Sequence, residues 1–438
     1  MVSAVRIIIA LNVACFIAMV CSSSVQSLLI PSSMTLLNWG ASSASETIAA
    51  HQFWRLFTCS FVHAGILHLG INLFVLRDIG REVEKAYGHL SFSLIYLLSA
   101  CGGALTSIFV NPLLISAGAS GAIFGSFGAM LAVVWRRPEN FPRGYLLLHG
   151  KIVGFLILYS IVFSFIDKNT DNAAHFGGCL VGFLAGLCFL PVQRNQPESL
   201  KKTGAALLIL ALFAVTFFAY RQLSNRPDVL AETYYRKAVQ MLKEKNYAAA
   251  LPLLDMTIAK APDNANAYCD RARANLELKH FDRAIADCTS ALRDKNVESS
   301  AYAIRAAIYQ KIGNYAASVK DLTSLIDLDA KDSMAYNNRA WSEEALGQLD
   351  AAVRDCDNSL RLKSDSATTY DTRGVAHILL NDFERAKVDL AQAIKLKQND
   401  GAFYYHLMIA KRRAGQSFDL ERQKFLELGY TPESWEPR

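Results

Sequence analysis

The sequence contains no CxxC pair and no cysteine or histidine spacing typical of a zinc site, although it has nine cysteines. It also has neither a phosphate-binding glycine loop nor an HExxH motif. These absences predict a protein that needs no metal, nucleotide or other cofactor. Six of the nine cysteines precede residue 221, where a small polarizable side chain in apolar surroundings is the simplest explanation.

Charge is scarce in the first half of the chain and balanced in the second half. Only 13 of the 45 Lys and Arg residues and 8 of the 39 Asp and Glu residues precede residue 221. Neither half has the basic surplus of a nucleic-acid-binding protein, so no nucleic acid partner is expected. A chain of 438 residues is also too long for one hydrophobic core. We therefore predict a membrane domain at 1–220, a short linker at 221–230 and a soluble domain at 231–438.

Seven apolar runs in the first half predict a polytopic bundle of membrane helices. Several runs are shorter than the ~20 residues of a typical span, but they are too many and too evenly spaced for a soluble core. A cleaved signal peptide is the alternative for the first run, which begins beside Arg6 and ends at Cys21 before three serines. The runs are 5–21, 61–79, 92–110, 119–135, 152–166, 172–190 and 205–220.

Positive charge is distributed unevenly between the predicted loops. If the N-terminus is inside, the inner segments carry eleven Lys and Arg residues and the outer loops carry only Arg55 and Lys168. This asymmetry predicts a cytoplasmic N-terminus and an extracytoplasmic second half. Because no transit peptide is visible, a bacterial inner membrane is favoured over an organelle. The outer loop at 22–60 is apolar and aromatic, and we expect it to lie in the membrane interface.

A few polar side chains are predicted to share one depth in the outer half of the bilayer. The run 61–79 holds His63, His68 and Asn72, and the last two are four residues apart on one helix face. The fourth run opens with Ser120, and the sixth run opens just before His175. No acidic residue is predicted deep within any run.

Stripes of small residues predict which of these helices touch. Such stripes let two membrane helices approach closely. Packing the fourth run against the sixth would bring Ser120 and His175 within hydrogen-bond reach. The stripes are Gly121, Gly125 and Gly128 in one run and Gly178, Gly182 and Gly186 in the other.

A serine and a histidine at this depth can form a nucleophile and its base. A serine hydroxyl becomes a good nucleophile when a base removes its proton, and histidine is the usual base. Asp167 and Asp171 are expected in a solvated loop, so Ser120 and His175 would form a dyad without a carboxylate. The oxyanion formed on attack needs preorganised donors, and the positive end of a helix dipole at Ser120 would help.

Each of these residues also has a simpler explanation when it is taken alone. Ser120 could be a packing or capping residue at a helix start, and Asn72 could be a hydrogen-bonding contact between helices. His63 could close a hydrogen bond in the outer loop. An intramembrane histidine such as His175 is more often functional, and it is the combination that favours a catalytic site.

Residues 1–190 resemble the rhomboid family of intramembrane serine proteases, whose motifs occur here in the family's order and spacing. The resemblance implies Ser120 as the nucleophile and His175 as the base. It also implies Asn72, His68 and the Ser120 amide as oxyanion donors, with Gly118 in support. The matching motifs are Gly118-Ala119-Ser120-Gly121 for GxSG, Ala174-His175 with Gly178 and Gly182 for AHxxGxxxG, and His63, His68 and Asn72 for HxxxxHxxxN.

The resemblance further implies a six-helix core, here with a seventh helix added, and single-pass transmembrane proteins as substrates. Substrate would enter laterally near the second and fifth spans, with a preference for small residues and locally unstable helices. Phe124 stands where many relatives have a tyrosine that stacks on the catalytic histidine, and we expect it to keep the stacking face. The alternative is a non-enzymatic scaffold or chaperone that binds transmembrane helices, as in inactive relatives.

The second half repeats with a period of 34 residues. Tyr234, Tyr268 and Tyr302 begin a series that continues at the same spacing to Tyr404, and a small residue follows four positions after each of the first five. This pattern is typical of tetratricopeptide repeats, which stack into a superhelix with a concave groove. We expect repeats from 231, 265, 299, 333 and 367 and a partial sixth from 401. The predicted fold is therefore all-α, a membrane bundle followed by a solenoid.

The repeats carry a recurring arginine and a recurring aspartate, which predict ion pairs between repeats more readily than ligand contacts. The arginines are Arg271, Arg305, Arg339 and Arg373, and the aspartates are Asp287, Asp321, Asp355 and Asp389.

Tetratricopeptide arrays generally bind peptides or proteins, so this array could capture substrate ectodomains, recruit an adaptor or mediate self-association. A disulfide between Cys269 and Cys288 is left open, whereas Cys288 and Cys356 lie two repeats apart and are not expected to form one.

Overall fold

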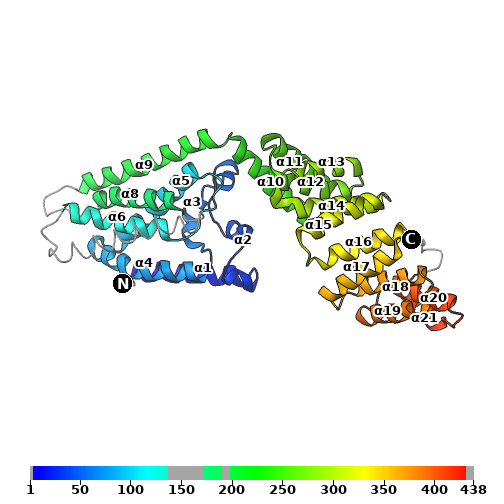
Figure 1. The fold of residues 1–438 in the computed structure, drawn as a ribbon. Helices are drawn as coiled ribbons and strands as arrows, with labels where there is room; N and C mark the ends of the chain where they lie inside the picture. Colours follow the sequence, from blue (N-terminus) through cyan, green and yellow to red (C-terminus); the bar gives the residue numbers. More distant parts are fainter. Residues whose placement is uncertain (1–2, 137–170, 190–197, 431–438) are drawn as a thin grey trace. The chain divides into compact units, whose positions relative to one another are not determined.

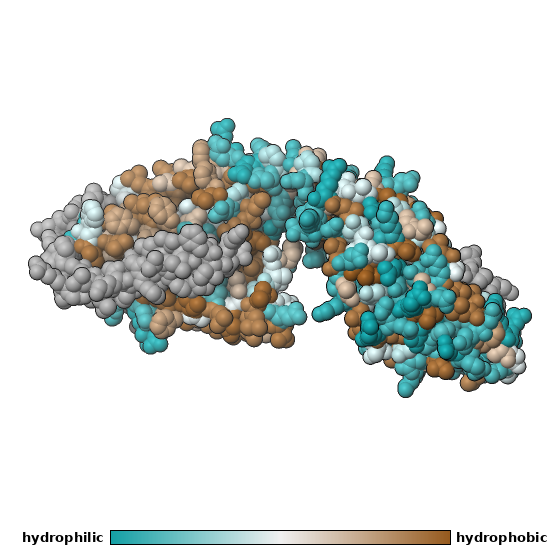
Figure 2. Space-filling view, viewed as in Figure 1, coloured by the Kyte–Doolittle hydropathy of each residue, from teal (hydrophilic) through white to brown (hydrophobic). Residues whose placement is uncertain are grey.

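The computed structural model describes residues 3–136, 171–189 and 198–430 (Figure 1). The chain divides into two compact units, Met1–Tyr234 and Tyr235–Arg438. In these described ranges the only β-pairing is an isolated bridge between Ser42 and Ser116. The all-α prediction is therefore confirmed. Figure 2 shows a largely apolar surface on the first unit and a mostly hydrophilic surface on the second.

Four helices of the described residues are long and apolar enough to cross a membrane. A fifth span is formed if the bent pair Arg55–Phe61 and Ile66–Tyr87, which meet at 96°, is counted as one. The predicted run 152–166 lies outside the described residues, so the count of seven remains a prediction. The apolar helices are α1 (Ala4–Cys21), α4 (Ile66–Tyr87), α5 (His89–Val110), the shorter α6 (Ser120–Arg136), α8 (Asn172–Phe189) and α9 (Glu198–Leu223).

The second apolar run is not one continuous helix, contrary to the prediction for 61–79. The helix α4 begins only at Ile66, after Gly65 at φ +120°. A Cβ at Gly65 would collide with the backbone carbonyl of Leu29, so only glycine fits this turn. His63 therefore precedes the helix, while His68 and Asn72 lie on it.

A buried arginine organises the segment between α1 and α4. Arg55 donates to the carbonyl oxygens of Leu37 (2.5 Å) and Ala41 (2.8 Å), and its guanidinium lies 4.6 Å from the Trp54 ring centroid. These bonds fold the predicted interfacial loop back onto itself. The segment contains α2 (Ser33–Asn38), α3 (Arg55–Thr58), 3₁₀ turns at Val25–Leu28 and Cys59–Phe61, and a π-helical turn at Ala44–Ala49.

The second unit is a series of antiparallel helix pairs with small residues where the two helices cross. Ala272, Ala306 and Ala340 are buried at these crossings, and Gly374 occupies the same position where a Cβ would lie 2.7 Å from Leu390. The helices are α10 (Pro227–Lys243), α11 (Tyr247–Lys260), α12 (Ala265–Glu277), α13 (Phe281–Ala291), α14 (Glu298–Lys311), α15 (Tyr315–Leu328), α16 (Ser333–Ala345), α17 (Leu349–Leu362), α18 (Ala367–Leu379), α19 (Phe383–Leu396), α20 (Gly401–Arg413) and α21 (Asp419–Glu427), with a 3₁₀ turn at Lys295–Val297.

The recurring arginines pair mainly within their own repeat rather than between repeats. Arg305 on α14 binds both carboxylate oxygens of Asp321 on α15, each at 2.8 Å. Its third nitrogen donates to Thr289 of the preceding repeat at 3.0 Å. Arg271 and Arg373 also bind the aspartate of their own repeat. In each, a further nitrogen donates to an aspartate of the preceding repeat. The predicted ion pairs are present, but the contact between repeats is the secondary one.

Candidate active site

Ser120 and His175 lie side by side at the starts of two helices. The His175 Nε2 atom is 3.0 Å from the Ser120 Oγ atom, which is hydrogen-bond distance. Ser120 is the first residue of α6, and His175 lies in the first turn of α8. Both side chains are half-buried, so they keep some access to the surface.

Glycines bring the two helices this close. A Cβ added at Gly178 would fall inside the van der Waals radius of the Gly121 carbonyl oxygen, and one at Gly182 would do the same to Gly125. Gly128 makes a similar approach to the carbonyl of Cys179. The backbones of α6 and α8 are therefore in direct contact. A side chain at these positions would push His175 away from the hydroxyl.

The ring of Phe124 fixes the orientation of the His175 imidazole. The two rings are stacked with centroids 4.3 Å apart and planes 12° apart. Phe124 is four residues after Ser120, so it lies one helical turn below the hydroxyl on the same face. Stacking of this kind restricts rotation of the imidazole and keeps Nε2 directed at the serine.

Asp171 is a helix cap, not the solvated loop residue predicted from the sequence. Its Oδ1 accepts from the Ala174 backbone N–H at 3.0 Å, and its carbonyl oxygen accepts from the His175 backbone N–H at 3.2 Å. The other carboxylate oxygen is buried. An aspartate just before a helix satisfies first-turn N–H groups that have no intrahelical acceptor. Asp167 lies outside the described residues.

Gly118 and His68 lie against each other beside the nucleophile. Gly118 has φ +130°, and a Cβ there would lie 2.6 Å from the His68 Cε1 atom. Its N–H donates to the carbonyl oxygen of Cys59 at 2.9 Å. Both the positive φ and the close approach of the imidazole require glycine here. This fixes the backbone that leads into Ser120.

His63 is fully buried and holds the residue before the serine. Its Nε2 atom accepts from the Ala119 N–H at 3.4 Å, and its ring lies 5.4 Å from the ring of His68. The sequence indicated only a structural bond in the outer loop for His63. No local sequence signal indicates this contact, because it follows the turn at Gly65 and joins residues 56 positions apart.

Asn72 is buried but bonded within its own helix. Its Nδ2 donates to the His68 carbonyl oxygen at 2.9 Å, which leaves the second N–H of the amide for another acceptor. The backbone N–H groups at the first turn of α6, beginning with Ser120, have no acceptor within the helix. Both α4, through Asn72, and the first turn of α6 therefore carry N–H groups that can donate to a further acceptor.

Comparison with known proteins identifies both units. The rhomboid domain family matches residues 50–192, which include every site residue described above. RHOMBOID-like protein 1 of Arabidopsis thaliana is 39% identical over 178 residues, covering 39% of this chain and 45% of the relative. Rhomboid protease GluP of Bacillus subtilis is 31% identical over 252 residues, covering 58% of this chain and 48% of the relative. This chain thus spans about half the length of these curated relatives.

The tetratricopeptide repeat family matches residues 299–332 and 367–400, which coincide with the third and fifth repeats predicted from the sequence. Among solved structures, YrrB, a TPR protein with an unusual peptide-binding site, is 18% identical with a TM-score of 0.37. That alignment covers 41% of this chain and 92% of YrrB. The chain is therefore an integral membrane protein that combines a rhomboid domain with a series of tetratricopeptide repeats.

Proposed function

We propose that this chain is an intramembrane serine endopeptidase that cleaves single-pass transmembrane proteins with Ser120 and His175. The observation that carries the proposal is the 3.0 Å separation of the His175 Nε2 and Ser120 Oγ atoms. Similarity to relatives named as rhomboid proteases supports the same chemistry. The other polar groups at the site have roles that fit this assignment.

The reaction follows from the positions of these groups. His175 Nε2 removes the proton from Ser120 Oγ as that oxygen attacks the carbonyl carbon of the scissile peptide bond. The resulting imidazolium then protonates the leaving amine, and the C–N bond breaks to give an acyl-enzyme. A water molecule, deprotonated by His175, attacks the acyl-enzyme and releases the carboxylate product with Ser120 restored.

The oxyanion of each tetrahedral intermediate needs donors that are already in place. The first-turn N–H groups of α6 meet this need, and the positive end of the helix dipole adds to it. The Asn72 amide and the His68 ring supply further donors from α4. Each such donor is typically worth about 3 kcal/mol of transition-state stabilisation, so losing one should slow the reaction without abolishing it.

The repeats are proposed to recruit the substrate or a protein partner. Their sequence contains no second constellation of catalytic residues, and tetratricopeptide arrays generally bind peptides or proteins. The loop charges support a cytoplasmic N-terminus and an extracytoplasmic repeat unit, and we propose a bacterial inner membrane as the location. In this arrangement the array would meet the ectodomains of membrane proteins.

The alternative, a scaffold that binds transmembrane helices without cleaving them, is less favoured. A scaffold needs neither a hydroxyl within bonding distance of an imidazole nor a ring that orients the imidazole. The bond between Ser120 and His175 and the stacking of Phe124 on the imidazole therefore support the enzyme over the scaffold.

The test is cleavage of a reporter with one transmembrane helix, incorporated with the purified full-length protein into lipid vesicles. The unaltered protein should yield two fragments. Ser120→Ala removes the attacking oxygen and should leave no detectable cleavage, whereas His175→Ala should lower the rate by about 10²–10⁴-fold, the typical contribution of a general base. Ser126→Ala is the matched control, because the Ser126 hydroxyl is bonded to the Ala122 carbonyl within the same helix. A protein that binds the reporter but leaves it intact would establish the scaffold instead.

A further inference from the structure

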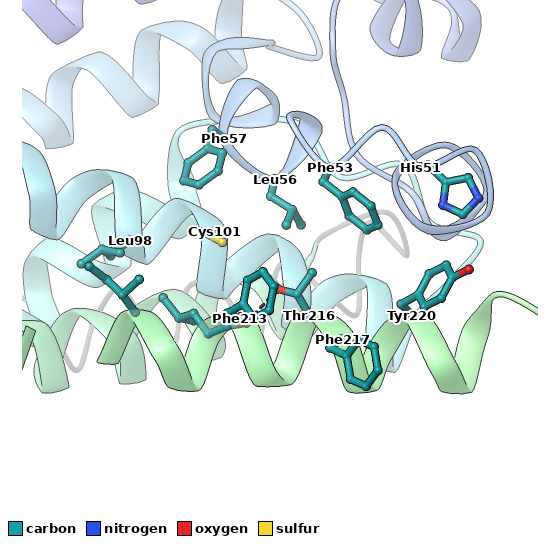
Figure 3. A pocket seen from close by; sticks show the side chains of 12 residues that line it. His51, Phe53, Leu56, Phe57, Leu98, Cys101, Phe213, Thr216, Phe217 and Tyr220 are labelled. Atoms are coloured by element: carbon teal, nitrogen blue, oxygen red, sulfur yellow. Dashed lines mark hydrogen bonds between the residues drawn. The ribbon is translucent and has the colours of Figure 1, made fainter. Parts of the chain in front are cut away.

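The rhomboid unit contains an apolar groove that the proposed reaction does not use. Its volume is about 520 Å³, and it lies between α9, α5 and the segment around α3 (Figure 3). None of the residues that line it belongs to the site around Ser120. The one hydroxyl along its middle, on Thr216, donates to the Leu212 carbonyl oxygen at 2.7 Å. The wall is therefore almost entirely hydrocarbon and aromatic.

The groove follows one face of α9 over the depth of a single leaflet. Lining side chains recur at Ile209, Phe213, Thr216 and Tyr220, with the spacing of one helix face. The eleven steps from Ile209 to Tyr220 along the α-helix rise about 16 Å, which is close to half of the ~30 Å hydrocarbon core of a bilayer. One hydrocarbon chain from one leaflet would occupy that length.

One end of the groove has the side chains expected at the depth of lipid headgroups. The His51 and Tyr220 rings lie 5.5 Å apart at that end, and Phe53 lies 6.5 Å from Tyr220 (Figure 3). Tyrosine and other amphipathic rings are enriched where a membrane meets water. The opposite end, near Leu98, is apolar. A molecule that fits must be apolar along its length and polar at one end.

The groove is open to the surface that faces the bilayer. Phe213 and Phe217 line it and are 72% and 57% exposed, and Leu210 beside them on α9 is 63% exposed. A second transmembrane helix normally packs on small residues, whereas this face presents phenylalanine, leucine and isoleucine. A flexible chain can fill the gaps between such side chains more readily than a rigid helix can.

We propose that this groove binds one acyl chain of a membrane phospholipid, with the headgroup beside His51 and Tyr220. The bound chain would fill the space between α9 and α5 and stabilise the seventh helix against the rest of the unit. The proposal does not depend on the proteolytic activity. It concerns α9, which packs only lightly against α5 and α8 and has a surface that is mostly exposed.

The test uses the full-length protein in vesicles that contain a phospholipid with a photoactivatable diazirine on one acyl chain. After irradiation, mass spectrometry should find cross-links concentrated on 209–220, 53–57 and 98–101. Thr216→Trp, which fills the middle of the groove, should reduce these cross-links severalfold. Thr216→Val, which keeps the size of the side chain, and Val215→Trp, on a neighbouring exposed face of α9, should leave them unchanged.

Circular dichroism and elution as a single species establish that each variant is folded before it is compared. Cross-links spread evenly over all the lipid-facing helices, or unchanged in Thr216→Trp, would overturn the proposal. Labelling of the groove by a diazirine-bearing transmembrane peptide in place of the lipid would also overturn it and would identify a substrate contact.

Discussion

The two units of this chain use different means to hold helices together. In the rhomboid unit α6 and α8 touch through glycines, so their backbones are in contact. In the repeat unit alanine occupies the helix crossings, and each arginine of the series binds a buried aspartate. A membrane unit gains little from the hydrophobic effect between helices and depends on close packing. The repeat unit can also bury charge, because each aspartate of the series is paired with an arginine.

The same difference affects how each unit tolerates change. The glycine contact between α6 and α8 occurs once and positions one pair of reacting groups. The interface between two helices of a repeat, in contrast, recurs in similar form along the array. We therefore expect single substitutions at the glycine contact of the rhomboid unit to abolish function, and single substitutions in the repeats to weaken one interface.

The largest effect is expected at the glycine contact. Gly182→Leu places a side chain against the Gly125 backbone, so α6 and α8 must separate and His175 must move from Ser120. We expect reporter cleavage to be lost and the unit to unfold at lower temperature. Gly70→Leu on α4 is the control, because a Cβ there meets nothing within 4 Å. Equal activity of the two variants would show that the contact does not position the site.

A smaller effect is expected at a repeat ion pair. Arg305→Ala leaves Asp321, whose side chain is 5% exposed, without its partner. Breaking a buried pair typically costs about 3–5 kcal/mol, whereas an exposed pair contributes about 0–1 kcal/mol. Arg385→Ala, in an exposed pair with Asp382, is the control. Hydrogen exchange should rise in α14 and α15 for the first variant only, and equal protection in both variants would contradict this account of the repeats.

The repeat unit also contains carboxyl groups that oppose stability at high pH. Burial, with help from the charge of Asp355, raises the pKa of Glu343 to about 7, and burial raises the pKa of Glu344 to about 7. Because each folded-state pKa lies above the unfolded value, stability is greatest below about pH 4.5 for these groups and falls as the pH rises toward 7. Glu343→Gln should therefore raise the Tm at pH 8 and have little effect at pH 4.

The control for that pH profile is Glu277→Gln, at an exposed position of α12. Thermal unfolding of the purified protein between pH 4 and pH 8 measures both variants. If the Glu343 and Glu277 variants follow the same profile, burial of Glu343 has no thermodynamic consequence and the assignment is wrong.

The smallest effect is expected at Phe124. Phe124→Tyr keeps a ring of the same shape against His175, so the rate of reporter cleavage should change little. Phe124→Ala removes the stacking surface, and the rate should fall more than the binding of the reporter does. A severe loss in the tyrosine variant would show that the site is packed too tightly to accept a hydroxyl.

Much of this architecture could be predicted from periodic features of the sequence. The 34-residue period placed the repeats, because every repeat must bury the same positions against its neighbours. The glycine stripes predicted that α6 and α8 touch, because membrane helices offer few other reasons for aligned glycines. Both arguments depend on regular spacings along the chain, which the sequence displays directly.

Features that depend on contacts between distant segments could not be predicted in this way. Gly65 breaks the second apolar run because the carbonyl of Leu29 lies against it, and nothing near Gly65 in the sequence indicates that contact. The sequence predicts a solvated Asp171. Its capping role could not be predicted because it depends on the exact residue at which α8 begins. The arginine series was expected to pair between repeats, but the fork of Arg305 reaches the adjacent helix of its own repeat more directly.

The central claim, that His175 activates Ser120, is tested most directly by the site of reaction with a fluorophosphonate. Intact-protein and peptide mass spectrometry of the full-length protein should find one adduct on Ser120, formed far more slowly in His175→Ala. The Ser120→Ala variant should show none. An adduct on another serine, or equal rates with and without the imidazole in a folded protein, would contradict the claim.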